Sequence, residues 1–289
     1  MTSEILLTND DGIDAVGLRA IHDALATDHE VTVVAPATNQ SGVGGRRSWW
    51  ETTVEYTETP FGYAVEGTPA DCVAVATVAL ELDPDVVVSG CNHGPNIGAH
   101  ILGQSGTVGA AMEASYLGTP AIAVSMYDRG NLPLPPTIGR GDFTLAGEVV
   151  ATLVDRFERA GLPMGANVVN VNVPAADDAA ADDPTYRLTE PARGFDVIEF
   201  HPGEDAPSEH GSDEPRGEMG MELRDRFWRE FLRGDVADDP GSDRLAAIDG
   251  EVSVSPLSTS RAIAGGRAGT RFDPTADPAH GSDRPGAPR

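Results

Sequence analysis

Apolar runs and amphipathic segments alternate over the first 175 residues of the chain. Five short runs are apolar almost throughout, as in strands buried on both faces of a parallel sheet: 4–8, 30–35, 85–90, 120–126 and 167–174. Between them, apolar residues recur at helical spacing, which predicts helices over 15–26, from Thr68, from about Thr107 and over 143–161. This alternation predicts an α/β fold with an open, doubly wound, mainly parallel sheet.

Two parts of the chain depart from this alternation. The stretch 49–66 predicts a β-hairpin with its turn near Pro60-Phe61-Gly62. After about residue 175 the chain carries only short strand-like pieces between polar, Gly- and Pro-rich stretches. We interpret 1–175 as the core and 176–265 as an extension of hairpins and loops that is suited to contacts between subunits. Residues 266–289 have little to bury and are predicted to be a disordered tail.

The charge balance restricts the partners of the protein. The 289 residues include 20 basic and 46 acidic side chains, a formal net charge of −26, and the chain has no lysine. So strong a negative field repels nucleic-acid polymers and anionic membranes. The Asp-rich, lysine-free composition favours adaptation to high salt over an ordinary acidic protein, because carboxylates keep a surface hydrated there.

Composition also limits location and chemistry. No apolar run approaches the roughly 18 residues of a membrane span, and the first twelve residues show no secretory signal, so we expect a cytoplasmic protein. The missing lysine excludes P-loop, pyridoxal-dependent and protein-kinase chemistry, each of which requires one. The two cysteines, Cys72 and Cys91, lack a metal-binding spacing and are interpreted as small buried apolar residues.

The strongest candidate for chemistry is the tetrapeptide Asn9-Asp10-Asp11-Gly12, which directly follows the first predicted strand. Ligands of doubly wound sheets bind beyond the carboxyl ends of the strands. Two adjacent carboxylates at that edge are unfavourable unless a cation or hydrogen-bond donors compensate them. A divalent metal site and a solvated Asx turn are both consistent with the tetrapeptide alone.

Loops after other strands add oxygen donors at the same edge. Ser41 follows the second strand and Asn92 follows the strand at 85–90. With the two aspartates they would form an all-oxygen site, which suits Mg²⁺, Mn²⁺ or Ca²⁺ rather than Zn²⁺. Ser105-Gly106-Thr107 stands at a helix start, which is either a plain N-cap or, beside a metal, a cradle for phosphate.

Together these segments resemble the SurE family of survival-protein phosphatases, which are also described as 5'/3'-nucleotidases. The resemblance rests on motifs in the order of the family: ILLTNDDGIDAVGL, QSG, GTPADCV, VVVSGCNHGPNIG, SGTVGAAMEA, PAIAVS, VNVNVP and VSVSPL. They cover roughly residues 4–260. The resemblance implies a Rossmann-like core, a C-terminal extension that builds homodimers or homotetramers, and hydrolysis of nucleoside monophosphates.

The resemblance also implies roles for particular residues. One divalent cation per subunit, Mg²⁺ or Mn²⁺, would be held by Asp10, Asp11, Ser41 and Asn92. The implied phosphate-binding residues are Asn9, Asn96, Ser105, Gly106 and Thr107. Asp10, Asp11 and Asn96 are then the catalytic candidates, with one of the aspartates orienting or deprotonating the attacking water. A phospho-aspartyl intermediate is the competing mechanism.

Other interpretations of the chain stay open. A non-catalytic nucleotide- or metal-binding module with a vestigial site fits the same motifs, whereas a response-regulator receiver is excluded because it requires a lysine. His93 is either a proton donor or an ordinary loop residue. Trp49 and Trp50 either stack on a nucleobase or belong to the core or an interface, and we favour the second role because paired aromatic residues in a hairpin are usually packed.

Overall fold

A computed structural model of the chain describes residues 2–128, 138–175, 184–194 and 238–259, and the backbone of two further strands at 197–200 and 222–225. The described core belongs to one unit that ends at Thr259. The predicted tail at 266–289 lies outside the described residues. No helix in the described ranges is both long and apolar enough to cross a membrane.

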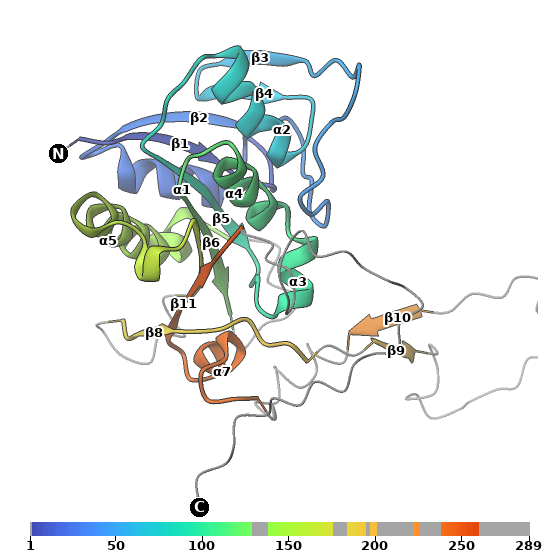
Figure 1. The fold of residues 1–289 in the computed structure, drawn as a ribbon, viewed down its shortest axis with the longest axis vertical. Helices are drawn as coiled ribbons and strands as arrows, with labels where there is room; N and C mark the ends of the chain where they lie inside the picture. Colours follow the sequence, from blue (N-terminus) through green and yellow to red (C-terminus); the bar gives the residue numbers. More distant parts are fainter. Residues whose placement is uncertain are drawn as a thin grey trace, which may run out of the picture. The chain divides into compact units, whose positions relative to one another are not determined.

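A mixed, mainly parallel sheet forms the centre of this unit (Figure 1). In the described residues its strand order is β3-β4-β2-β1-β5-β6-β7-β11-β8. The five predicted buried strands are confirmed as β1 Glu4–Thr8, β2 Glu30–Pro36, β5 Val86–His93, β6 Ala121–Tyr127 and β7 Val168–Pro174. All five run parallel to their neighbours in this group, so their carboxyl ends meet at one edge.

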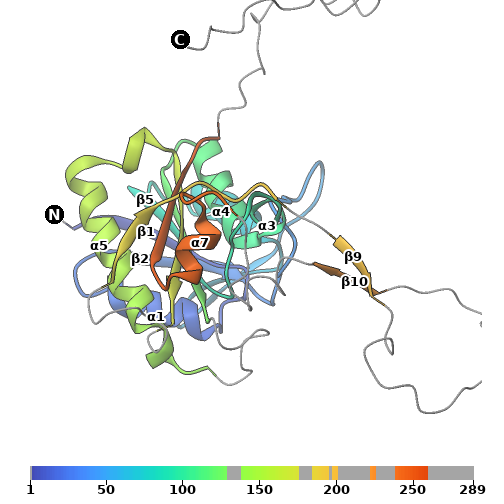
Figure 2. The ribbon, with the colours of Figure 1, turned by 90° about the horizontal axis from the view of Figure 1, so that it is seen from below.

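Helices cover both faces of the sheet (Figure 2), as a doubly wound fold requires. One face packs on α1 (Val16–Leu25) and α5 (Thr144–Ala160). The other face packs on α2 (Pro69–Ala74), which continues into a wider helical turn over Val75–Ala79, and on α4 (Gly106–Tyr116). Short helical turns also occur at Arg140–Phe143 and Pro163–Gly165.

The alternation of side chains along β5 shows how the sheet serves two cores. Val86 and Val88 belong to the core under α1 and α5, whereas Val87 belongs to the core under α2 and α4. All three are fully buried. Because successive side chains of a strand point to opposite faces, an unbroken apolar run is needed when both faces are covered.

The predicted hairpin is present but shorter than 49–66. It consists of β3 (Tyr56–Thr59) and β4 (Gly62–Val65), paired antiparallel. Trp49 and Trp50 precede it on a loop and are 75% and 76% exposed, so they do not belong to the core of this chain.

The part of the chain after residue 175 adds to the same sheet. Strand β11 (Val252–Leu257) pairs antiparallel with β7, and β8 (Tyr186–Leu188) pairs parallel with β11. Strands β9 (Val197–Phe200) and β10 (Glu222–Asp225) form a separate antiparallel pair. Helices α3 (Ala99–Gln104) and α7 (Asp243–Ile248) were not expected from the sequence, and the boundary at 175 stays a prediction.

Candidate functional site

The loop after β1 is a tight turn closed by Asn9. Its buried side chain donates to the carbonyl oxygen of Gly12 (2.9 Å) and accepts from the Gly12 N–H (3.2 Å). Gly12 has a φ of 103°, which a residue with a side chain rarely adopts. The structure therefore contains the Asx turn that the tetrapeptide suggests. Asp10 and Asp11 lie between the two ends of this turn.

Asp10 is 3% exposed and lies against the start of α4. The Thr107 hydroxyl donates to Asp10 Oδ1 at 2.6 Å. A Cβ on Gly106 would come within 2.7 Å of the Asp10 Cβ, so only glycine lets the helix start approach this closely. The backbone N–H of Gln40 donates to the Asp10 carbonyl oxygen at 2.7 Å. Asp10 is thus held by α4 and by the loop after β2.

Asp11 joins two other loops. Its Oδ1 accepts from the Asn39 side-chain amide (3.3 Å) and its Oδ2 accepts from the His93 backbone N–H (3.1 Å). These contacts connect the loop after β2 and the end of β5 to one carboxylate. The imidazole of His93 is turned toward Phe143, with 6.4 Å between the ring centroids, and burial lowers the pKa of His93.

The two carboxylates carry an uncompensated charge. Burial, together with the neighbouring charge of Asp11, raises the pKa of Asp10 from 3.8 to about 6, although the hydrogen bond from Thr107 opposes the shift. Burial also raises the pKa of Asp11, opposed by the bonds from His93 and Asn39. Among the described residues, neither aspartate has an ion pair with an arginine or histidine. A bound cation would supply the missing charge.

Of the other two predicted metal ligands, Asn92 lies at the end of β5 and Ser41 lies in the loop after β2. The half-buried Asn92 donates its Nδ2 to the Gly94 carbonyl oxygen at 2.7 Å, which fixes its amide and leaves Oδ1 as an available ligand. The exposed Ser41 donates its backbone N–H to Asn39 Oδ1 at 2.9 Å, and Asn39 in turn contacts Asp11. Both residues therefore belong to segments that bond to Asp11.

The donor chemistry fits a hard cation. Within the described ranges, no group of three or more His, Cys, Asp or Glu side chains is placed to hold a metal. The predicted ligands, two carboxylates with one amide and one hydroxyl oxygen, are donors of the kind that suits Mg²⁺ or Mn²⁺, which keep waters in their remaining positions.

The predicted phosphate-binding residues divide into two groups. Gly106 and Thr107 lie on Asp10, as described above. Ser105 caps α4, because its hydroxyl accepts from the Val108 N–H at 3.1 Å. Asn96 lies over the sheet, where its Nδ2 donates to the Ser125 hydroxyl at 2.8 Å. In this structure the Ser105 side chain caps the helix and the Asn96 side chain bonds to Ser125 of β6, and their phosphate roles stay predictions, as does that of Asn9.

The loop between β2 and β3 is tied to α4 by close backbone contacts. The Gly44 N–H donates to the Gln104 carbonyl oxygen at 2.9 Å. A Cβ on Gly109 would come within 2.4 Å of the Gly44 carbonyl oxygen, so the loop crosses the helix at a position that only glycine permits. Consequently the loop that carries Ser41 is held against the first turn of α4.

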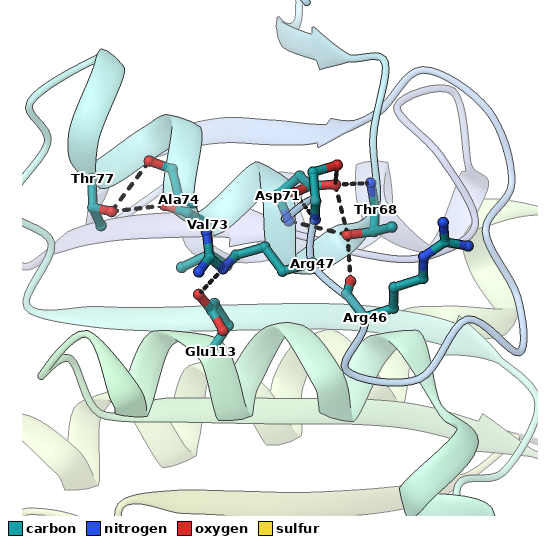
Figure 3. A network of polar contacts seen from close by, with 9 residues as sticks. Arg46, Arg47, Thr68, Asp71, Val73, Ala74, Thr77 and Glu113 are labelled. Carbon is teal, nitrogen blue, oxygen red and sulfur yellow. Dashed lines mark hydrogen bonds and ion pairs between the residues drawn. The ribbon is translucent and has the colours of Figure 1, made fainter. Parts of the chain in front are cut away.

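Polar side chains anchor the far end of this loop (Figure 3). The buried Asp71 accepts from the Ser48 N–H (2.7 Å) and from the Thr68 N–H (2.9 Å), and together with Thr68 it forms the capping box of α2. The Thr68 hydroxyl also donates to the Arg46 carbonyl oxygen at 2.6 Å. Arg47 pairs with Glu113 of α4 at 2.9 Å, whereas the Arg46 side chain points away from that pair.

Sequence reasoning missed several residues of the site. Asn39 and Gln40 bond to the acidic pair, but both lie in a polar loop where such residues are common. Two further residues, Asn170 and Asn172, contact the Asn96 backbone from β7. These two left a visible signal, because Asn is depleted in strands and here occurs twice in an otherwise apolar run.

Comparisons with known proteins show the family and agree with this fold. The family described as Survival protein SurE matches residues 5–194. A protein named 5'-nucleotidase SurE from Natronomonas pharaonis is 43% identical over 256 residues, which cover 88% of this chain and 92% of that protein. A protein of the same name from Haloarcula marismortui is 42% identical over 256 residues, covering 88% of this chain and 87% of that protein.

A solved structure gives the same result for the fold. The crystal structure of the SurE protein from Aquifex aeolicus aligns with a TM-score of 0.69 at 30% sequence identity, covering 89% of this chain and 94% of that chain. The predicted α/β class is therefore confirmed. Both of these relatives come from halophilic archaea, in agreement with the adaptation to high salt that the composition predicts.

Proposed function

This chain belongs to the SurE family, and we propose that it is a divalent-metal-dependent phosphomonoesterase that hydrolyses nucleoside monophosphates, as a 5'-nucleotidase. The observation that carries the proposal is the pair of the buried Asp10 and the half-buried Asp11, which lacks an ion pair in the described residues and lies at the start of α4. The names of the relatives supply the substrate class. A non-catalytic module has no observation in its favour.

We assign the cation to the oxygens of Asp10, Asp11, Ser41 and Asn92, one ion per subunit, with Mg²⁺ or Mn²⁺ as the metal. When bound, such an ion offsets negative charge on the phosphate and acidifies water in its coordination shell. Thr107 keeps the Asp10 carboxylate in one orientation through its 2.6 Å hydrogen bond. Asn39 and the His93 N–H do the same for Asp11.

One carboxylate of the pair accepts the proton of the attacking water. Water oxygen forms the new bond to phosphorus, the ester P–O bond breaks, and the nucleoside leaves as an alcohol that takes up a proton. The stereochemistry at phosphorus distinguishes the phospho-aspartyl route, because its two successive displacements retain the configuration that a single attack by water inverts.

The experiment that tests the function is phosphate release from a substrate panel. The panel contains 5'-AMP, 3'-AMP and short-chain polyphosphate, assayed in molar KCl with Mg²⁺, Mn²⁺ or EDTA. We expect metal-dependent release from 5'-AMP, and the other two substrates show whether the activity extends to 3'-nucleotides and polyphosphate.

The variant Asp10→Asn should abolish the release, and the matched control Asp14→Asn should retain it. Asp14 is an exposed aspartate four residues away that pairs with Arg19. Full activity in EDTA, or in the Asp10→Asn variant, would reject the proposal.

We further propose that the enzyme acts in the cytoplasm as a homodimer or homotetramer. This assembly rests on the family resemblance and on the interpretation of 176–265 as an extension for subunit contacts. Light scattering at molar salt measures the mass of the assembly, and a monomer at all concentrations would contradict this part of the proposal.

A further inference from the structure

Two asparagines interrupt the apolar run of β7. Asn170 and Asn172 are completely buried. Like Val168 on the same strand, they lie on the face of the sheet that packs under α2 and α4. Burying an amide is unfavourable unless its donors and acceptor find partners. The hydrogen-bond partners of Asn170 and Asn172 therefore indicate why the buried strand β7 contains two asparagines.

The partner of both is the backbone of Asn96. Asn172 Oδ1 accepts from the Asn96 N–H at 2.8 Å, and Asn172 Nδ2 donates to the Asn96 carbonyl oxygen at 3.0 Å. Asn170 Nδ2 donates to the same carbonyl oxygen at 2.9 Å. The amide of Asn172 thus bonds to both backbone groups of one residue, as a neighbouring strand would.

Ser125 of β6 completes the contact. Ser125 lies opposite Asn172 in the register of β6 and β7, so both side chains project from the same face. Its hydroxyl accepts from the Asn96 Nδ2 at 2.8 Å. Asn96 is itself 5% exposed, so four buried hydrogen bonds hold this single residue against the sheet. We call Asn170, Asn172 and Ser125 the amide clamp.

The amide clamp holds the segment that enters the site. Between Ser89 and Asn92 the register of β5 and β6 shifts, an irregularity that redirects the end of β5. The segment that follows carries the Asn92 amide and the His93 N–H that bonds to Asp11. The Gly94 N–H donates to the Met126 carbonyl oxygen at 3.1 Å, so the segment is attached to β6 as well.

We propose that Asn172, supported by Asn170 and Ser125, is a positioning residue that fixes segment 92–96 so that Asn92 and the His93 N–H reach the cation site and Asp11. The inference rests on the proposed function, because it assigns Asn92 as a metal ligand. Asn172 acts through the backbone of Asn96 and does not touch substrate.

Two substitutions of similar size separate the contributions of the amide. Asn172→Leu removes both hydrogen bonds and leaves the buried Asn96 N–H and carbonyl oxygen with one partner fewer each. Asn172→Asp keeps an acceptor for the N–H but places a second oxygen against the Asn96 carbonyl oxygen. The control is Val171→Ala on the same strand, because Val171 faces the opposite core under α1 and α5 and truncating it loosens packing without touching Asn96.

The first measurement is Mn²⁺ binding by calorimetry on the full chain without substrate. We expect Asn172→Leu to weaken Mn²⁺ binding by about 10- to 100-fold, the effect typical of residues that orient metal ligands. Asn172→Asp should weaken it too, and Val171→Ala should leave it unchanged. Activity of Asn172→Leu should recover at high Mn²⁺, because the clamp acts on the position of a ligand.

The second measurement is amide hydrogen exchange of segment 92–98 in the metal-free chain. Asn172→Leu should speed exchange there and leave the segment 41–48 unchanged. Ser125→Ala removes only the acceptor of Asn96 Nδ2, so it should shift both measurements in the same direction by less. This variant keeps the test decisive if Asn172→Leu fails to fold.

The outcomes separate the two proposals. If the wild-type chain neither binds nor requires a divalent metal, the proposed function fails. If the wild-type chain does bind Mn²⁺ but Asn172→Leu, or Ser125→Ala in its place, binds it equally well and exchanges segment 92–98 at the wild-type rate, the positioning role of the amide clamp is overturned.

Discussion

Two segments meet at Asp11, and the protein holds them in different ways. Segment 92–98 is fixed from inside, by the amide clamp and by the fully buried Asp243, which accepts from the Gly98 N–H at 2.7 Å. Segment 39–48 is fixed partly from inside, by the buried Asp71, and partly by an exposed ion pair. Its anchors are backbone contacts with α4, the capping box of α2 and the ion pair of Arg47, which is 43% exposed, with Glu113.

The difference indicates how one side of the site can stay rigid while the other side adjusts to a ligand. Hydrogen bonds in the interior are insensitive to salt, and losing one partner leaves an unsatisfied buried group. An exposed ion pair is weak and is screened further at molar salt. We infer that segment 92–98 supplies a fixed amide ligand, whereas segment 39–48, with its exposed Ser41, adjusts when substrate and cation bind.

The largest effect is expected where the two loops meet. Asp11→Asn removes a charge and one of the two acceptors that join Asn39 to the His93 N–H. Hydrolysis of 5'-AMP at saturating Mn²⁺ should fall by about 10²- to 10⁴-fold, the range for a lost general base. Asp14→Asn is the matched control. Retained turnover would show that the junction of the loops is not the site.

The next effect concerns the outer loop. Asp71→Ala removes the acceptor of Ser48 and Thr68 and breaks the capping box of α2. The free energy of unfolding should fall by about 2–4 kcal/mol, measured by denaturant titration. Mn²⁺ affinity should fall less than in Asn172→Leu, because Ser41 is a neutral, exposed ligand. Equal losses of affinity would remove the contrast between the loops.

Asp85→Ala is the control for Asp71→Ala. Asp85 is an exposed aspartate whose carboxylate accepts one backbone N–H, that of Glu4. We expect a loss of less than about 1 kcal/mol for this variant, because its acceptor is replaced by water. A loss as large as that of Asp71→Ala would mean that burial of the acceptor does not decide the effect.

A third prediction concerns pH and the charge at the junction. Folding raises the pKa of Asp10 from 3.8 to about 6 through burial, so the folded chain favours the protonated form. Metal-free protein should therefore lose about 1–3 kcal/mol of stability as pH rises from about 4 through about 6. Asp10→Asn should remove most of this loss, so the inactive variant should be more stable at neutral pH without metal.

Mn²⁺ should reverse that order. Binding to the folded state stabilises the wild-type chain by mass action, while Asp10→Asn lacks the ligand and gains little. Thermal unfolding at pH 5 and 7, with EDTA or Mn²⁺, measures both effects. A wild-type chain that is more stable than Asp10→Asn in EDTA at pH 7 would contradict the assigned charge imbalance.

The smallest effect belongs to the exposed ion pair. Glu113→Gln breaks the contact with Arg47 and should cost between zero and about 1 kcal/mol at low salt. The cost should shrink in molar KCl, whereas the effect of Asn172→Leu should stay constant. Denaturant titration of both variants at two salt concentrations checks this. Equal salt dependence would contradict the assignment of one segment to interior anchoring and of the other to anchoring that is partly at the surface.

Much of the fold was predictable because burial on two faces leaves an unmistakable apolar run. The strands from 4–8 to 167–174 were placed correctly to within a residue or two, except that β5 continues through the irregularity to His93. Helix α7 was missed because it has only six residues, which are too few turns to show a helical pattern of apolar positions.

The position of the acidic pair was predictable because it follows β1. The hydrogen bonds that the residues around the pair make were not predictable. A hydroxyl at a helix start predicts a cap, and Ser105 is one, yet Thr107 two residues later donates to Asp10. Asn96 looked like a ligand for phosphate, while the structure ties its backbone to Asn172. Side-chain direction depends on packing between distant segments, which local sequence patterns do not encode.

The most direct test of the account is anomalous diffraction from crystals of the full chain soaked in Mn²⁺ and inorganic phosphate. We predict one manganese peak per subunit, within coordination distance of oxygens from Asp10, Asp11, Ser41 and Asn92, with phosphate beside it near the start of α4. A peak absent from this place, or one held by other residues while these four side chains stay apart, would contradict the central claim that loops after three neighbouring strands bind one cation.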